Sequence, residues 1–247
     1  GVGFDNDLLH AQPAARTPEG EMTTLEVAAK ATQDEWFYFS PYEGITDYED
    51  IDWYDYFLAR GFAVVLSAGI GTNNSEGFET CGSDVEIDAF AAIIEWLTGD
   101  RVAYTDKENN IEVKADWSNG SVGMTGRSYA GTTQFGLAAT GVEGLKTIVP
   151  VSGIASWYDY YNCQGVNIGT DEQIAGLAMY CAGRYINKED WATIEESYGA
   201  YLHQMAEDMF ANGNDYNDLA WSNRDYTLGD GFKCSALIVQ GLNDYNV

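Results

Sequence analysis

Apolar residues along this chain fall into short continuous runs, typical of buried strands, and into longer stretches with helical spacing. The clearest helix covers residues 84–97, with Asp84 as its expected N-cap. A shorter helix is expected at 54–60, and the apolar runs predict strands at 36–39, 62–66, 121–124, 147–151 and 236–239. One face of the longer helix is apolar and contains Ile87, Phe90, Ala91, Ile94 and Leu97.

Strands that alternate with helices predict an α/β protein, with a mainly parallel sheet and helices on both faces. Residues 1–34 are mixed and polar and are expected to be a lead-in segment, while 35–247 form one domain. Within that domain, residues 105–117 are expected to be a charged insertion or linker. Residues 156–231 are aromatic-rich and have helical but no strand patterns, so they are expected to form a cap over the strand ends.

The formal net charge of this 247-residue chain is −27, which argues against nucleic acid or an anionic membrane surface as a partner. Hydrophobic residues make up 45% of the chain, as in a globular protein with a substantial core. No apolar run is long enough to span a bilayer.

The four cysteines show neither Cys-x-x-Cys spacing nor a histidine at zinc spacing, so no metal site and no cofactor are expected. Cys163 and Cys181 flank one insertion and are candidates for a disulfide in an oxidising compartment. The chain begins with neither an initiator methionine nor a signal peptide and stops at Val247, directly after a predicted strand. We therefore expect it to be an excerpt of a longer protein.

Residues 123–131 read Gly-Met-Thr-Gly-Arg-Ser-Tyr-Ala-Gly, between a predicted strand and a small-residue helix at 132–140. This pattern is typical of a nucleophile elbow, a sharp strand-to-helix turn that exposes a serine hydroxyl at the end of a sheet. The strand and helix backbones crowd there, so small residues are needed two positions before and after the serine. Gly126 and Ala130 meet this need, which makes Ser128 the candidate nucleophile. The alternative is an ordinary serine in a glycine-rich turn.

Asp244 follows the strand expected at 236–239, in the loop where the triad acid of such a hydrolase belongs. The alternative is that Asp244 only forms a turn. The histidine comes last in this order of triad residues, but His10 and His203 both precede Asp244. Both are expected to be surface or packing residues, and the catalytic histidine is expected beyond Val247.

Five motifs occur in order along the chain. They read Lys-Ala-Asp-Trp-Ser-Asn-Gly at 114–120, Met-Thr-Gly-Arg-Ser-Tyr at 124–129, Gly-Val-Glu-Gly at 141–144, Ser-Trp-Tyr-Asp-Tyr-Tyr at 156–161 and Gly-Leu-Asn-Asp-Tyr-Asn-Val at 241–247. With them, the chain from about Trp36 to Val247 resembles the catalytic domain of the Xaa-Pro dipeptidyl-peptidases, which are serine exopeptidases among the cocaine-esterase-like α/β hydrolases.

This resemblance implies an α/β-hydrolase fold with a helical cap, and it implies roles for four residues of the catalytic machinery. Ser128 matches the nucleophile and Asp244 matches the triad acid. Tyr42, in the triplet Ser-Pro-Tyr, matches a tyrosine whose hydroxyl helps to hold the oxyanion. The backbone N–H of Tyr129 would be the second donor, because the hole needs donors fixed where negative charge develops.

The resemblance also implies three substrate-binding residues. Trp157 and Tyr160 match aromatic residues that line a proline pocket, although aromatic residues of a cap can also be ordinary packing residues. Asn246 matches a residue near the N-terminal end of the substrate. The carboxylate that would meet the ammonium group of the substrate is left open.

The implied activity is the release of N-terminal dipeptides whose second residue is proline, from peptides with a free N-terminus. Hydrolysis of small esters or of α-amino-acid esters by the same triad stays open, as does a non-catalytic binding module with a hydrolase-like fold. A homodimer of the full-length protein is left open. The resemblance implies a cytoplasmic location, whereas the acidic composition and the cysteines leave an extracellular or cell-surface location open.

Overall fold

The computed structural model describes residues 53–73, 75–106, 108–163, 166–167, 173–182 and 188–244. They belong to two compact units, whose boundary in the sequence lies between Ala68 and Gly69. In the first unit, the helix expected at 54–60 is confirmed as α3 (Trp53–Leu58). The strand expected at 62–66 is wrong, because this segment has no ladder partner among the described residues, and the Phe62 side chain is 59% exposed.

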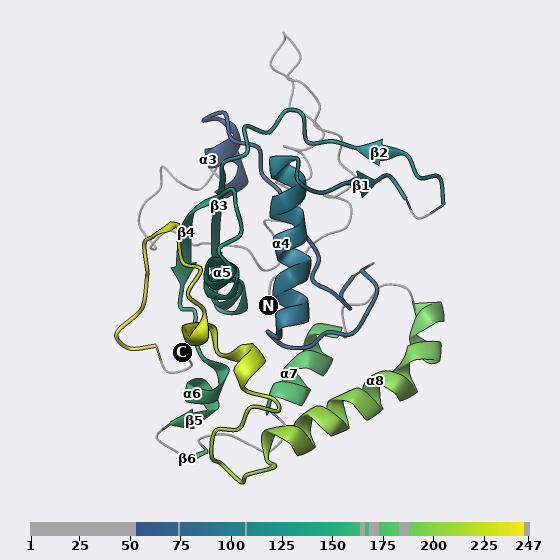
Figure 1. Cartoon of the computed structure of the whole chain (residues 1–247), viewed down its shortest axis with the longest axis vertical. Coiled ribbons are helices and arrows are strands. Elements are labelled where there is room, and N and C mark those ends of the chain that lie inside the picture. Colours follow the sequence, from purple (N-terminus) through teal and green to yellow (C-terminus); the bar gives the residue numbers. More distant parts are fainter. Residues whose placement is uncertain are drawn as a thin grey trace, which may run out of the picture. The chain divides into compact units, whose positions relative to one another are not determined.

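The second unit contains a parallel sheet of three strands, in the order β3 (Val122–Arg127), β4 (Leu145–Val151) and β7 (Ser235–Ala236) (Figure 1). The register pairs Met124 with Ile148, and Ile148 with Ala236. Beyond β7, Val239 still pairs with Val151 in an isolated parallel bridge. The prediction of parallel strands at these three places in the sequence is confirmed.

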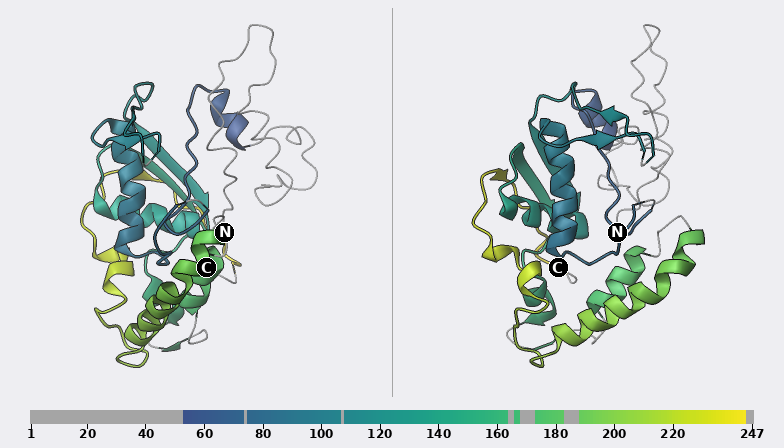
Figure 2. Two further views of the ribbon diagram at one scale, coloured as in Figure 1. Left: turned by 90° about the vertical axis from the view of Figure 1, so that its right-hand side faces the viewer. Right: turned by 45° about the vertical axis from the view of Figure 1, so that its right-hand side comes forward.

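Two helices form the layer beside this sheet (Figure 2). Helix α5 (Tyr129–Thr140) packs on β3 and β4, and α4 (Asp84–Thr98) packs on α5. The N-cap of α4 is Ser83, so the expectation of Asp84 as the cap is wrong by one residue. The core between these elements contains Ile87, Ala91, Ile94, Leu137, Ala138, Leu145 and Ile148, which confirms the apolar face expected for α4.

Two segments differ from the sequence-based expectation. The charged stretch expected to be a linker overlaps a small antiparallel hairpin, β1 (Ala103–Tyr104) with β2 (Glu112–Val113). Leu237 and Ile238, which follow β7, are each 62% exposed, so the run 236–239 is not buried as expected. In both cases the sequence pattern shows that a segment is extended or polar, but it does not show what packs against it.

The segment expected as a cap is helical in its described part. It contains α6 (Trp157–Tyr161), α7 (Gln173–Ala182), α8 (Lys188–Met209) and the short 3₁₀ helices η3 (Ser222–Arg224) and η4 (Tyr226–Leu228). A small hairpin of β5 (Asn162–Cys163) and β6 (Val166–Asn167) was not expected. The β4 arrow points toward α6, and α7 and α8 lie side by side beyond it (Figure 1).

The cap has its own apolar core, which Cys81 joins from the loop before α4. Its buried members from the cap include Trp157, Tyr198, Met205 and Trp221. None of the helices in the described part of the chain is long and apolar enough to cross a membrane.

The first turn of α5 approaches the end of β4 so closely that backbone touches backbone. A Cβ atom added at Gly131 would lie 2.8 Å from the carbonyl oxygen of Val151 and 3.3 Å from the Cα of Gly153. These neighbours are main-chain atoms and cannot rotate away. Gly199, in the middle of α8, has open space around the same position.

We expect Gly131→Ala to lower the free energy of unfolding by about 1–3 kcal/mol, because the methyl group forces α5 away from β4. Gly199→Ala is the matched control and should raise that free energy by up to about 1 kcal/mol, because alanine is the better helix former. Urea unfolding of both variants measures the difference. Equal midpoints for the two variants would show that α5 is not held this closely to the sheet.

Candidate active site

Ser128 occupies the turn between β3 and α5, with φ 59° and ψ −123°. A positive φ is rare and costly for a residue with a side chain, so this backbone is strained. Three hydrogen bonds hold it: the Ser128 N–H donates to the Val151 carbonyl (2.9 Å), and its carbonyl accepts from the N–H groups of Gly131 (2.8 Å) and Thr132 (2.9 Å). The half-buried side chain makes no capping hydrogen bond with α5, so its hydroxyl is not used to terminate the helix.

The small residues on either side of Ser128 are required by this turn. A Cβ atom added at Gly126 would lie 2.8 Å from the Cβ of Ala130 and 3.0 Å from its carbonyl oxygen. The buried Gln134 side chain fixes the same region, because its amide donates to the Ala130 carbonyl (2.8 Å) and its oxygen accepts from the Val149 N–H (3.0 Å). The crowding that the sequence predicts around the serine is therefore present in this turn.

Tyr129 is the first residue of α5, where backbone N–H groups have no partner within the helix. Its ring packs edge-to-face on Trp157, with ring centroids 5.5 Å apart. Its hydroxyl lies 2.8 Å from Glu79 Oε1 and 2.7 Å from Glu86 Oε2. The side chain is thus held at both its ring and its hydroxyl, next to the candidate nucleophile.

Trp157 is a core residue of the cap, with 2% of its surface exposed, and its indole N–H donates to the Tyr226 hydroxyl (3.1 Å). Tyr160, on the same helix α6, is half-buried, and its ring lies edge-on to Trp157 with centroids 6.3 Å apart. Of these two aromatic residues, Tyr160 therefore has the more accessible ring, and Trp157 packs behind it.

Asp244 lies in a turn that follows the bridge between Val239 and Val151, and its N–H donates to the Gly241 carbonyl (3.1 Å). Burial is the largest cause that raises the pKa of Tyr160, and the negative charge of Asp244 is the second cause. Ring contacts therefore run from Tyr129, the neighbour of Ser128, through Trp157 to Tyr160, and the charge of Asp244 acts on Tyr160. Tyr129, Trp157 and Tyr160 thus lie in contact, and Asp244, from a segment more than 100 residues after Ser128, is near enough to act on Tyr160 through its charge.

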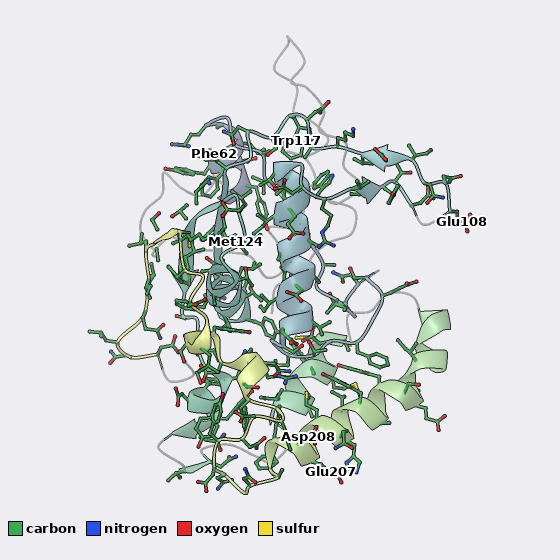
Figure 3. The ribbon with its side chains drawn as sticks, viewed as in Figure 1. Phe62, Glu108, Trp117, Met124, Glu207 and Asp208 are labelled. Atoms are coloured by element: carbon green, nitrogen blue, oxygen red, sulfur yellow. The ribbon has the colours of Figure 1, made fainter. Side chains whose placement is uncertain are left out.

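Other sequence-based expectations have different outcomes. Tyr42 and Asn246 lie outside the described residues, as do His10 and the side chain of Cys163, so the expected Cys163–Cys181 pair stays a hypothesis. The His203 imidazole is 77% exposed on α8 and lies 3.4 Å from Glu207, which confirms it as a surface residue. Figure 3 shows Glu207 and Asp208 on this acidic helix.

Sequence reasoning missed a buried polar cluster beside Tyr129, formed by Glu79, Glu86 and Arg224, each 2% exposed. Burial and the charge of Glu86 raise the pKa of Glu79 to about 8, and burial likewise raises the pKa of Glu86. One signal was available, because Glu86 precedes Phe90 by four residues and so lies at the edge of the apolar face of α4. Nothing in the local sequence marks Glu79 or Arg224.

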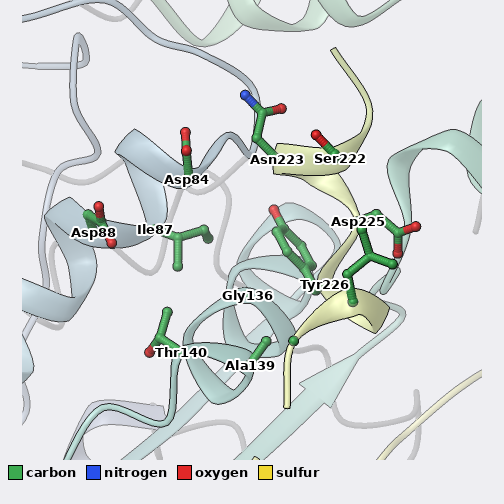
Figure 4. A pocket seen from close by; sticks show the side chains of 12 residues that line it. Asp84, Ile87, Asp88, Gly136, Ala139, Thr140, Ser222, Asn223, Asp225 and Tyr226 are labelled. Atoms are coloured by element: carbon green, nitrogen blue, oxygen red, sulfur yellow. The ribbon is translucent and has the colours of Figure 1, made fainter. Parts of the chain in front are cut away.

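The described residues contain no group of three or more histidine, cysteine or acidic side chains that could hold a metal ion. A shallow pocket lies between the start of α4, the middle of α5 and the 3₁₀ helices, and Asp84, Asp88, Gly136 and Tyr226 are among its lining residues (Figure 4). None of the predicted site residues that the structure describes lines it. This pocket is therefore separate from the cluster around Ser128.

Comparison with known proteins identifies the family of this chain. The family model of the X-Pro dipeptidyl-peptidase (S15 family) matches residues 7–247. The Xaa-Pro dipeptidyl-peptidase of Lactobacillus helveticus is 44% identical over 198 residues, which cover 78% of this chain and 25% of that protein. The Xaa-Pro dipeptidyl-peptidase of Ligilactobacillus salivarius is 37% identical over 248 residues, covering 98% of this chain and 29% of that protein.

Among solved structures, a CocE/NonD family hydrolase from Staphylococcus aureus matches with a TM-score of 0.43 and 20% identity, covering 68% of this chain and 25% of that chain. The chain spans between a quarter and a third of the length of the curated relatives named above. Its parallel sheet, with a serine on a strained strand-to-helix turn and a helical cap, confirms the predicted α/β-hydrolase fold. This chain belongs to the X-Pro dipeptidyl-peptidase (S15) family.

Proposed function

We propose that this chain carries the nucleophile and the substrate pocket of a serine exopeptidase that releases N-terminal Xaa-Pro dipeptides through an acyl-enzyme. The observation that supports it best is the strained turn at Ser128, together with the ring contacts that link Tyr129, Trp157 and Tyr160. Family membership supports the same reaction class.

Ser128 is the proposed nucleophile. Its Oγ attacks the carbonyl carbon that follows proline, and a histidine takes the hydroxyl proton. Asp244 is the proposed acid that orients this histidine and stabilises its charged form. Collapse of the tetrahedral intermediate expels the amine of the remaining peptide, which takes up the proton, and water then releases the dipeptide from Ser128.

The oxyanion is proposed to be held by two donors. One is the backbone N–H of Tyr129, at the start of α5, where the helix dipole also favours negative charge. The other is the hydroxyl of Tyr42. Because Tyr129 is anchored by its ring and by its hydroxyl, its N–H is fixed before the substrate arrives.

The proline pocket is proposed to be walled by Tyr160 and supported from behind by Trp157. Proline is compact and has no N–H, so aromatic walls can select it by shape. Asn246 is proposed to lie near the N-terminal end of the substrate. An exopeptidase recognises that end by its free ammonium group, because an internal peptide lacks the charge and leaves its counter-charges unpaired.

Ser128→Ala should lower kcat for a Gly-Pro anilide by about 10⁴-fold or more, because no nucleophile is left at the elbow. The assay uses the natural protein at its full length. Ser121→Ala, an exposed position just before β3, is the matched control and should keep its activity. Near-normal peptidase activity in Ser128→Ala would contradict the assignment.

Tyr160→Leu should lower kcat/KM for Gly-Pro anilide at least about 10-fold more than for a small acetate ester, because only the first substrate places proline against the ring. Tyr158→Leu is the control on the same helix. Its ring packs on Tyr216 and Trp221, so it should affect both substrates alike. Equal losses on both substrates in Tyr160→Leu would mean that Tyr160 supports the fold and not the pocket.

A further inference from the structure

The Tyr129 hydroxyl lies between two buried carboxyl groups, at 2.8 Å from Glu79 Oε1 and 2.7 Å from Glu86 Oε2. The same two oxygens accept backbone N–H groups, from Cys81 (2.7 Å) and Gly82 (2.6 Å) respectively. Cys81 has a φ of 53°, which is costly for a residue with a side chain, so the loop is strained at this position. This strain indicates that the surrounding contacts over-determine the loop.

The hydrogen bonds of this cluster fix the number of its protons. A phenol has one proton and can donate it to one carboxylate only. The contact to the other carboxyl is a hydrogen bond only if that carboxyl is protonated and donates to the phenol oxygen. Both contacts are hydrogen bonds in the state in which one of the two carboxyl groups keeps its proton.

The net charge of the cluster leads to the same number of protons. Arg224, from η3, is buried and donates to the carbonyls of Thr80 (2.6 Å) and Cys81 (3.1 Å), in the loop that joins the two glutamates. Two carboxyl groups and one guanidinium are neutral together when they hold one extra proton. Since an uncompensated buried charge is costly, the neutral state is the favoured one.

The other titratable groups that face the cluster do not change this count. They are Cys81 in the loop, Cys181 from α7, Tyr198 from α8 and Tyr226 from η4. Burial raises the pKa values of Cys81, Tyr198 and Tyr226, and it does the same for Tyr129, so these groups stay neutral. The proton that can leave near neutral pH is therefore the one shared by the two glutamates.

We propose that Glu79 and Glu86 are positioning residues, which share one proton across the Tyr129 hydroxyl and so fix the Tyr129 N–H that faces the oxyanion. This rests on the proposed function. When the proton leaves to solvent, two carboxylates repel one another across Tyr129. The start of α5 then loses its alignment, and turnover falls at alkaline pH through a group other than the catalytic histidine.

The first test is the pH profile of kcat for a Gly-Pro anilide, in the natural protein at its full length. Wild type should lose activity with a midpoint near pH 8, the value to which burial raises the pKa of Glu79. Glu79→Gln imitates the protonated carboxyl and cannot ionise, so it should keep kcat within about threefold at pH 7 and should not show this decline. Glu79→Leu, which has no polar group, and Tyr129→Phe should lower kcat about 10-fold with KM unchanged.

Glu207→Gln, on the exposed face of α8, is the matched control and should keep the wild-type profile. If Glu79→Gln shows the same alkaline decline as wild type, the positioning role is wrong. Unchanged kcat in both Tyr129→Phe and Glu79→Leu would also overturn it. Ser128→Ala is assayed beside them, because its result alone decides the proposed function and so separates the two failures.

A second prediction does not depend on activity. The folded protein holds the Glu79 proton up to about pH 8, whereas an unfolded glutamate releases it near 4.5, so this group makes stability fall as pH rises between these values. Glu79→Gln does not titrate. As pH rises from 5 to 8, its midpoint temperature of thermal unfolding should therefore increase relative to that of wild type. The difference in midpoint between Glu207→Gln and wild type should stay constant over the same pH range. Parallel curves for Glu79→Gln and wild type would show that no such proton is held.

Discussion

The close approach of α5 to the end of the sheet is the constraint on which the rest of the site depends. Helix α5 begins immediately after Ser128, so the chain reverses within one residue, and the backbones of β3, α5 and the β4 end meet there. Such contact is possible only because residues 126, 131 and 153 are glycines and residue 130 is alanine. The same contact forces Ser128 into a conformation that no strand or helix would give it. The strained backbone of Ser128 and the tight packing of α5 are therefore two results of one steric requirement.

The cap and the serine turn are connected through the loop of residues 79–82. Each of its four carbonyls accepts a hydrogen bond from a cap side chain: Tyr198 binds Glu79, Arg224 binds Thr80 and Cys81, and Tyr226 binds Gly82. The side chain of Glu79 in this loop, and that of Glu86 just after it, hold the Tyr129 hydroxyl. The cap and the first residue of α5 are thus joined through this loop by hydrogen bonds that are buried or partly buried.

The sequence predicts those parts of the molecule that depend on local sterics or on periodicity. The elbow at Ser128 and the apolar face of α4 belong to this class, because their causes lie within about 15 residues. The expected strand at 62–66 fails because an apolar run becomes a strand only when neighbouring strands pair with it. The Glu79–Glu86–Arg224 cluster was missed because Arg224 reaches the loop of the glutamates from far along the chain, as its hydrogen bond to the Thr80 carbonyl, 144 residues away, shows. In the sequence alone, Glu79 and Glu86 are not distinguished from the other acidic residues of the chain.

That acidic composition also acts on the buried cluster. The chain carries 39 acidic against 12 basic residues, so the cluster sits in a negative potential. Such a potential favours retention of a proton by a buried carboxyl, in the same direction as burial itself. Exposed charges are screened within about 10 Å at moderate ionic strength, whereas Glu86 and Arg224 are desolvated and close to Glu79. The proton is therefore held chiefly by burial and by the second carboxyl, and the surface charge adds a contribution that salt can weaken.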